Sequence, residues 1–273
     1  MPEDLETINK SELPFADLLP QVAEEIPHIV EVLQRAQNNR TKVLNAKARG
    51  VRLAGLNQWL GYLKELEAAF LDPRLEPLRF LMVRIRMNYD AAIEATLTGM
   101  PSVVNDSMRD VMEIELLLQD FAATPANVQR WLAADEKLVM DEFAPKHLRR
   151  RKASRLGIQP KDLSDTQDYK GHSRALHVQP RSYPHERRGL VEMGHPIFDD
   201  FLFWELLGHA LQLCETLESL VNSLAPGLTI STDILTRLGK VGEGYKRVRE
   251  WNQIMGALVE AHRESGAEVS DEE

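Results

Sequence analysis

The stretch from Phe198 to Leu224 constrains the fold more than any other part of this 273-residue chain. It is apolar over a length that suits a long helix, and its polar side chains fall in one narrow stripe. The stripe consists of Glu205, His209, Gln212, Glu215 and Ser219. A helix that is apolar around most of its circumference lies in the interior of a protein. We therefore predict that this helix occupies the centre of a helical bundle.

Helical spacing of apolar residues recurs through most of the remaining chain. Aromatic residues make up only 6% of the sequence, and no long run alternates between apolar and polar residues as a half-buried strand would. Further helices are expected over about 15–70 with a break near Gly50, from Pro77 to about Leu97, from about Ser102 to Phe121, from Asn127 to Glu142, and from Thr232 to Ala261. The predicted fold is an all-α, multi-helix bundle without significant β-sheet.

The chain carries no internal repeat and no composition typical of a linker between domains, so we predict a single helical domain over residues 1–273. Four segments lack helical spacing. They are predicted as a loose lead at 1–13, irregular basic loops at 144–168 and 180–196, and a disordered acidic tail at 266–273.

Cysteine content and hydropathy indicate the compartment. Cys214 is the single cysteine, so the chain can form no internal disulfide, and we predict a cytoplasmic protein. The apolar helix makes a small buried side chain a better interpretation of Cys214 than a catalytic thiol. The first ten residues do not resemble a signal peptide, and no apolar run is long enough to span a membrane. The sequence leaves open whether the chain forms a homo-oligomer.

The net charge of −9 is unevenly distributed. Residues 144–190 hold 12 basic and 4 acidic side chains, a net charge of +8, whereas the rest of the chain has a net charge of −17. The densest basic run is Arg149, Arg150, Arg151 and Lys152. We expect residues 144–190 to contact RNA or another anionic partner if one binds. The alternative is a solvated loop, since no aromatic residue lies within the run to stack on bases.

Histidines gather between 147 and 209, but they do not match a metal-binding pattern. Glu205 and His209 have one residue too many between them for the Glu-x-x-His element of a di-iron bundle, and no second copy occurs. We find no phosphate-binding glycine loop and no nucleophile elbow. The sequence therefore predicts neither a metal nor a cofactor.

One polar constellation has the residue types that chemistry needs. Arg109 and Glu113 lie one turn apart on a predicted helix, and Tyr169, Ser173 and His177 have the same spacing if their stretch is helical. We predict that these five residues meet in one site between two packed helices. Such a cluster can bind a polar ligand or move a proton, or it can hold a short helix in place.

The order of these residues resembles a family of bacterial helical proteins known chiefly as a domain of unknown function. The resemblance rests on Arg109, Glu113, Trp131, Tyr169, Ser173 and His177, and covers roughly Leu75 to Arg181. It implies an all-helical fold and a shared polar cluster, but no established activity. Some members are distantly similar to HEPN helical domains, which include ribonucleases of toxin and phage-defence systems. The HEPN signature of an arginine, four to six residues and a histidine fits Arg188 to His195.

Two hypotheses follow from the sequence. The first is an interaction or ligand-sensing helical module built around the polar cluster. The second is an RNA-processing, phage-defence or toxin-type nuclease that uses the same cluster together with the basic segment. The sequence does not decide whether the protein is an enzyme.

Overall fold

A computed structural model describes residues 20, 23–47, 50–163, 169, 201–228 and 239. These residues are helical with connecting turns, and no strand occurs among them, which confirms the predicted all-α class. The main helices are α2 (Pro27–Lys47), α3 (Val51–Ala69), α4 (Arg79–Thr98), α5 (Pro101–Ala123), α6 (Ala126–Leu132), α7 (Glu136–Leu138), α8 (Pro145–Leu156) and α11 (Phe201–Leu224). Short helical turns are η2 (Glu76–Leu78), the π-helical η3 (Val139–Phe143) and η4 (Pro160–Asp162).

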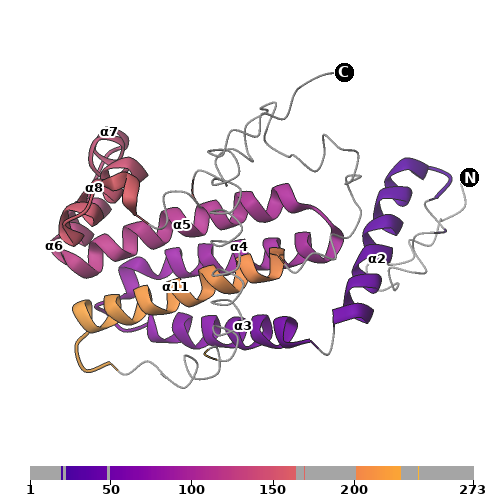
Figure 1. The fold of residues 1–273 in the computed structure, drawn as a ribbon, viewed down its shortest axis with the longest axis horizontal. Helices are drawn as coiled ribbons and strands as arrows, with labels where there is room; N and C mark the ends of the chain where they lie inside the picture. Colours follow the sequence, from indigo (N-terminus) through magenta and orange to yellow (C-terminus); the bar gives the residue numbers. More distant parts are fainter. Residues whose placement is uncertain are drawn as a thin grey trace, which may run out of the picture.

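Helices α3, α4, α5 and α11 lie side by side and form the body of the molecule, with α6 to α8 at one end of α5 and α2 at the opposite end (Figure 1). The turn signals of the sequence fall at the helix ends. Gly50 is the residue before α3, and Pro101 is the first residue of α5. Between α4 and α5, Gly99 adopts a φ of 80°, a backbone conformation that glycine reaches without strain.

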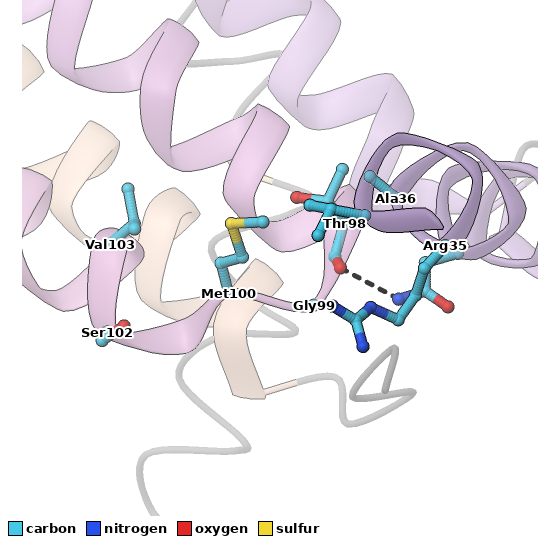
Figure 2. Close-up of a pocket in the computed structure, with 9 residues that line it drawn as sticks. Arg35, Ala36, Thr98, Gly99, Met100, Ser102 and Val103 are labelled. Carbon is cyan, nitrogen blue, oxygen red and sulfur yellow. Dashed lines mark hydrogen bonds between the residues drawn. The ribbon is translucent and has the colours of Figure 1, made fainter. Parts of the chain in front are cut away.

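Helix α2 packs against α4 through a narrow strip. Asn39 is buried there, and its Nδ2 donates a hydrogen bond of 3.0 Å to the main-chain oxygen of Thr98 at the end of α4 (Figure 2). Arg40 forms an ion pair with Glu94, one turn earlier on α4. The Asn39 bond therefore supplies a partner for one of the carbonyl groups that the end of α4 leaves without a helical donor.

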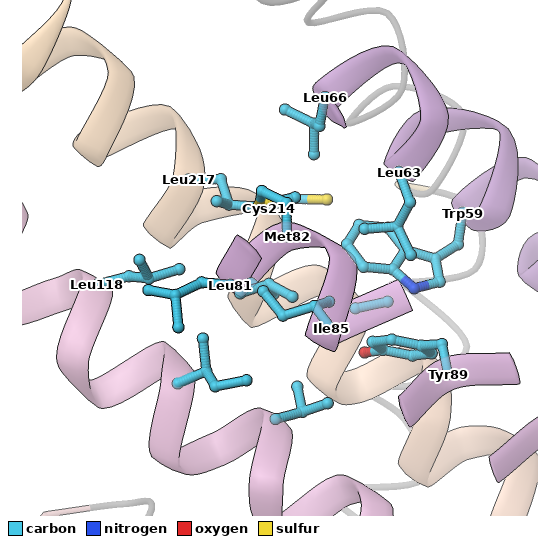
Figure 3. Close-up of a cluster of buried hydrophobic side chains, with 14 of the residues drawn as sticks. Trp59, Leu63, Leu66, Leu81, Met82, Ile85, Tyr89, Leu118, Cys214 and Leu217 are labelled. Atoms are coloured by element: carbon cyan, nitrogen blue, oxygen red, sulfur yellow. The ribbon is translucent and has the colours of Figure 1, made fainter. Parts of the chain in front are cut away.

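The core is continuous through the four long helices (Figure 3). Trp59 on α3 packs edge-on against Tyr89 on α4, with ring centroids 5.2 Å apart. The Tyr89 hydroxyl donates to the main-chain oxygen of Leu206 on α11 at 3.3 Å, so this buried polar group has a partner. Full burial of each large apolar side chain contributes roughly 1.5–3 kcal/mol.

Helix α11 contacts α3, α4 and α5, which confirms the prediction that it lies at the centre of the bundle. Cys214 on this helix is fully buried, and burial raises the pKa of its thiol well above the ordinary value. A neutral, inaccessible thiol behaves as a small apolar side chain.

The predicted single helix from Asn127 to Glu142 is wrong. The chain forms α6, turns after Leu132, and continues as α7 and then η3. Asp135 causes the interruption, because its side chain accepts a hydrogen bond of 2.8 Å from the main-chain nitrogen of Leu138. Helical spacing alone predicted one continuous helix. An aspartate that caps a helix in this way starts a new helix instead.

The predicted irregular loop at 144–168 is also wrong over Pro145–Leu156, because α8 occupies these residues. Pro145 stands at the first helical position, and Gly157 ends the helix with a φ of 68°. Only Leu148 and Ala153 of this helix are buried hydrophobic residues, so it lacks the apolar stripe on which the prediction depended. The segments at 1–13, 180–196, 232–261 and 266–273 lie outside the described residues.

Along the described part of the chain, no helix combines the length and the apolar character needed to cross a membrane.

Candidate functional site

Three of the five residues predicted to form a site are in contact. The Tyr169 hydroxyl donates to Oε1 of Glu113 at 2.9 Å and accepts a hydrogen bond of 3.3 Å from Nη2 of Arg109. The same Arg109 nitrogen lies 3.2 Å from Oε1 of Glu113. Ser173 and His177 lie outside the described residues. The Tyr169 hydroxyl thus completes a triangle with the ion pair on α5.

Arg149 on α8 is a fourth member that the sequence assigned only to the basic run. Its guanidinium carbon lies 3.5 Å from the centroid of the Tyr169 ring, and that of Arg109 lies at 5.5 Å. Both arginines are therefore within the range in which a cation is attracted to an aromatic face. We call Arg109, Glu113, Arg149 and Tyr169 the Tyr169 cluster.

The Tyr169 cluster is partly open to solvent. The Arg109 and Glu113 side chains are 32% and 34% exposed. The hydrogen bond to Tyr169, together with the charges of Glu113 and Asp106, raises the pKa of Arg109, so its guanidinium stays cationic. Its Nε is shielded from solvent and has no hydrogen-bond acceptor among the described residues. A shielded donor without an acceptor is uncommon in proteins and indicates that an acceptor belongs beside it.

A second arginine–carboxylate cluster lies further along α5. Asp120 is buried and receives hydrogen bonds on both carboxylate oxygens. The donors to Oδ1 are Arg151 Nε at 2.9 Å and Arg155 Nη1 at 3.1 Å, and those to Oδ2 are Arg151 Nη2 at 2.8 Å and Asn127 Nδ2 at 2.8 Å. We call Asp120, Asn127, Arg151 and Arg155 the Asp120 cluster. It joins α5 to both α6 and α8.

Arg151 makes one more bond, from Nη1 to the main-chain oxygen of Glu142 at 2.6 Å. All three nitrogens of its guanidinium are thus engaged within the fold. Arg150, by contrast, is exposed, as is Lys146 one turn earlier on α8. The residues of the predicted basic run therefore differ in their surroundings. Arg151 contacts α5 and η3, Arg149 contacts the Tyr169 ring, and Arg150 faces solvent.

Helix α11 contributes a buried acid–base pair. His209 Nε2 lies 2.9 Å from Oε1 of Glu205, one turn away. No group of three or more metal-ligating side chains occurs among the residues that the structure describes. The pair therefore has the character of a polar contact within the bundle.

Comparison with known proteins assigns no identity, because no family model, curated protein or solved structure matches the chain. The resemblance to a family of unknown function remains a prediction.

Proposed function

We propose that this protein is a helical ligand-binding module whose Tyr169 cluster receives an anionic oxygen group. The observation that carries the proposal is the shielded Nε of Arg109, which has no acceptor among the described residues. An oxygen of a phosphate or carboxylate would complete its hydrogen bonding, and guanidinium groups bind such oxygens in a fixed fork geometry.

The composition of the Tyr169 cluster suits this role. Its two arginines outnumber its one carboxylate, which leaves a net positive charge for an anion. Glu113 and the Tyr169 hydroxyl both contact Nη2 of Arg109. The guanidinium is therefore already held in place, and ordering it costs little free energy when a ligand binds. If the stretch that follows Tyr169 is helical, Ser173 and His177 lie one and two turns beyond Tyr169 and would supply further donors.

Isothermal titration calorimetry with inorganic phosphate at constant ionic strength tests the proposal. Arg109→Gln removes the charge and the shielded donor, so phosphate binding should weaken at least tenfold, which equals about 1.4 kcal/mol. Arg130→Gln is the matched control, because Arg130 is also a partly exposed arginine paired with a carboxylate, that of Glu142 on η3. The control should bind phosphate as the parent does.

Two results would contradict the proposal. One is the absence of saturable heat with the parent protein. The other is equal weakening in Arg109→Gln and Arg130→Gln, which would show that only the net charge matters.

A second candidate function is nucleic-acid binding by α8, as in a HEPN-like RNA-processing enzyme. It is favoured by the exposed side chains of Lys146 and Arg150, which lie one turn apart beside Arg149. Binding that neutralises phosphates weakens with salt at a slope of about −0.7 to −0.9 per phosphate. Replacing both residues with Gln should therefore make the slope shallower by about 1.5 in a gel-shift titration with single-stranded RNA.

Incubating the parent protein with labelled RNA separates binding from cleavage. A parent protein that shows neither salt-sensitive binding nor cleavage would rule out this second function. Arg151 is unsuitable for either test, because its replacement would also release Asp120.

A further inference from the structure

A cavity of about 220 Å³ lies where α2 meets the corner between α4 and α5, far along α5 from the Asp120 cluster (Figure 2). Three of the segments that the structure describes contribute to its walls. They are α2 with Val32, Arg35, Ala36 and Asn39, the end of α4 with Thr98, Gly99 and Met100, and the start of α5 with Ser102 and Val103.

Among the described residues of this cavity, the charged one is Arg35, which is exposed on α2. Arg35 has neither a hydrogen bond nor an ion pair with any described residue, and the same holds for the Ser102 hydroxyl. The Thr98 hydroxyl, by contrast, already donates to the main-chain oxygen of Glu94 at 2.8 Å. None of the described residues that line the cavity is acidic. The charge of its lining is therefore positive, and an anionic group is the complement that it lacks.

The remaining walls are apolar and reach the surface. Val32, Met100 and Val103 line the cavity while remaining 45%, 41% and 42% exposed. Ile29, one turn before Val32 on α2, extends this apolar surface beyond the cavity and is also exposed. Exposed apolar side chains beside a concave site are typical of surfaces that a ligand covers.

We propose that the cavity binds a small monocarboxylate with an apolar tail. The carboxylate would pair with Arg35, and the tail would lie against Val32, Met100 and Val103. In a liquid, one water-sized group occupies roughly 30 Å³, so the cavity has room for about seven such groups. A medium-length chain therefore fits with its end at the open mouth of the cavity. A cation finds no acidic partner among the described lining residues, and a purely polar anion leaves the apolar walls exposed.

This site is independent of the Tyr169 cluster, since Arg109 lies two turns into α5 from Ser102. Octanoate is the probe, titrated by isothermal calorimetry into the full-length chain. Octylammonium, with the same tail and the opposite charge, and inorganic phosphate, with charge and no tail, are the comparison ligands. Octanoate should bind with a saturable heat, and the other two should show no saturable binding that depends on Arg35.

Arg35→Gln should weaken octanoate binding at least tenfold, because a charge-assisted pair and its fork geometry are lost. Lys42→Gln is the matched control, since Lys42 is exposed on the same helix, loses the same charge and does not line the cavity. Ala36→Leu should also weaken binding, because it narrows the cavity while leaving Arg35 in place. Arg109→Gln should bind octanoate as the parent does.

The proposal fails if the parent protein shows no saturable octanoate binding, if octylammonium binds as tightly, or if Arg35→Gln and Lys42→Gln behave alike. Loss of octanoate binding in Arg109→Gln, with retention in Arg35→Gln, would also overturn it and place the carboxylate in the Tyr169 cluster. Circular dichroism of each variant distinguishes a folded protein that has lost binding from an unfolded one.

Discussion

The two arginine–carboxylate clusters on α5 have similar chemistry and different surroundings. Glu113 and Asp120 are two turns apart on the same helix, about 10 Å along its axis. Glu113 is 34% exposed and meets Arg109 and Tyr169 through one oxygen. Asp120 is 1% exposed, and both of its oxygens receive two hydrogen bonds.

The difference indicates that residue type alone does not separate a structural cluster from the cluster for which we propose a binding role. Asp120 is fully paired, so it has no capacity for a ligand, and its role is to fasten α6 and α8 to α5. In the Tyr169 cluster, Nε of Arg109 has no acceptor in the part of the chain that the structure describes, and the cluster is open to solvent. Burial and the number of satisfied hydrogen bonds therefore distinguish the two roles.

The largest effect should come from Asp120→Asn. It leaves two arginines without their shared carboxylate at a buried position, and breaking such a pair costs about 3–5 kcal/mol of unfolding free energy. Urea titration followed by circular dichroism measures the loss. If the variant does not fold, Arg155→Gln provides a milder test, since it removes one of four donors and leaves the Arg151 pair intact. A loss below about 1 kcal/mol in Asp120→Asn would mean that the cluster behaves as a surface ion pair.

The Asp120 cluster should also weaken in acid. Burial by itself raises the pKa of Asp120, but hydrogen bonds from Arg151, Asn127 and Arg155 outweigh it and lower the pKa below the ordinary value. As the pH falls, Asp120 is therefore protonated in the unfolded chain before it is protonated in the folded protein. The contribution of the Asp120 carboxylate to stability should be complete above its unfolded-state pKa of about 3.9. It should be lost as the pH falls through the lower pKa that Asp120 has in the folded state.

Urea titrations at about pH 6 and about pH 3 check this dependence. The difference in unfolding free energy between the parent and Asp120→Asn should shrink at the lower pH. A difference that stays constant would show that the Asp120 carboxylate contributes no pH-dependent stability.

Arg109→Gln should have a much smaller effect on stability than Asp120→Asn. Its ion pair is one-third exposed and lies within one helix, and pairs of this kind contribute about 0.2–1 kcal/mol. Equilibrium urea unfolding gives the value, with Arg130→Gln as the reference for an ordinary surface pair. A loss of several kcal/mol would instead make the Tyr169 cluster a structural element like the Asp120 cluster.

The smallest effect on stability is expected from Tyr169→Phe. It removes the hydroxyl that bonds Glu113 and Arg109 but keeps the ring on which the Arg149 guanidinium lies. Loss of a partly exposed hydrogen bond costs about 0.5 kcal/mol, the low end of the usual range. Phosphate binding should weaken by a smaller factor than in Arg109→Gln, as calorimetry on the two variants would show. Stronger weakening in Tyr169→Phe would mean that the hydroxyl, and not Arg109, is the main group that holds the anion.

The all-helical class, the central position of α11 and the break points at Gly50 and Gly99 could be predicted from the sequence. These features follow from apolar spacing and from glycine and proline, which act over a few residues. Helix α8 could not be found in this way, because polar contacts between its arginines and Asp120 anchor it. Its helical limits are visible at Pro145 and Gly157, and within them Arg151 and Arg155 lie one turn apart.

The candidate site could be predicted only in part. Spacing placed Arg109 and Glu113 on one helix, and their contact with Tyr169 was predicted from the matching spacing of a second stretch. The contact of Arg149 with the Tyr169 ring depends on how α8 lies across α5, and no local pattern encodes that placement. The burial of Asp120 could not be predicted for the same reason, because it depends on the packing of α8 against α5.

Thermal unfolding with and without inorganic phosphate tests the central claim most directly, because a ligand that binds the folded state raises its stability. In Asp120→Asn, the midpoint should fall while the increase caused by phosphate is retained. In Arg109→Gln, the midpoint should stay close to that of the parent while the increase caused by phosphate disappears. The reverse pattern, with phosphate stabilisation lost in Asp120→Asn and retained in Arg109→Gln, would contradict the division of α5 into a structural and a binding cluster.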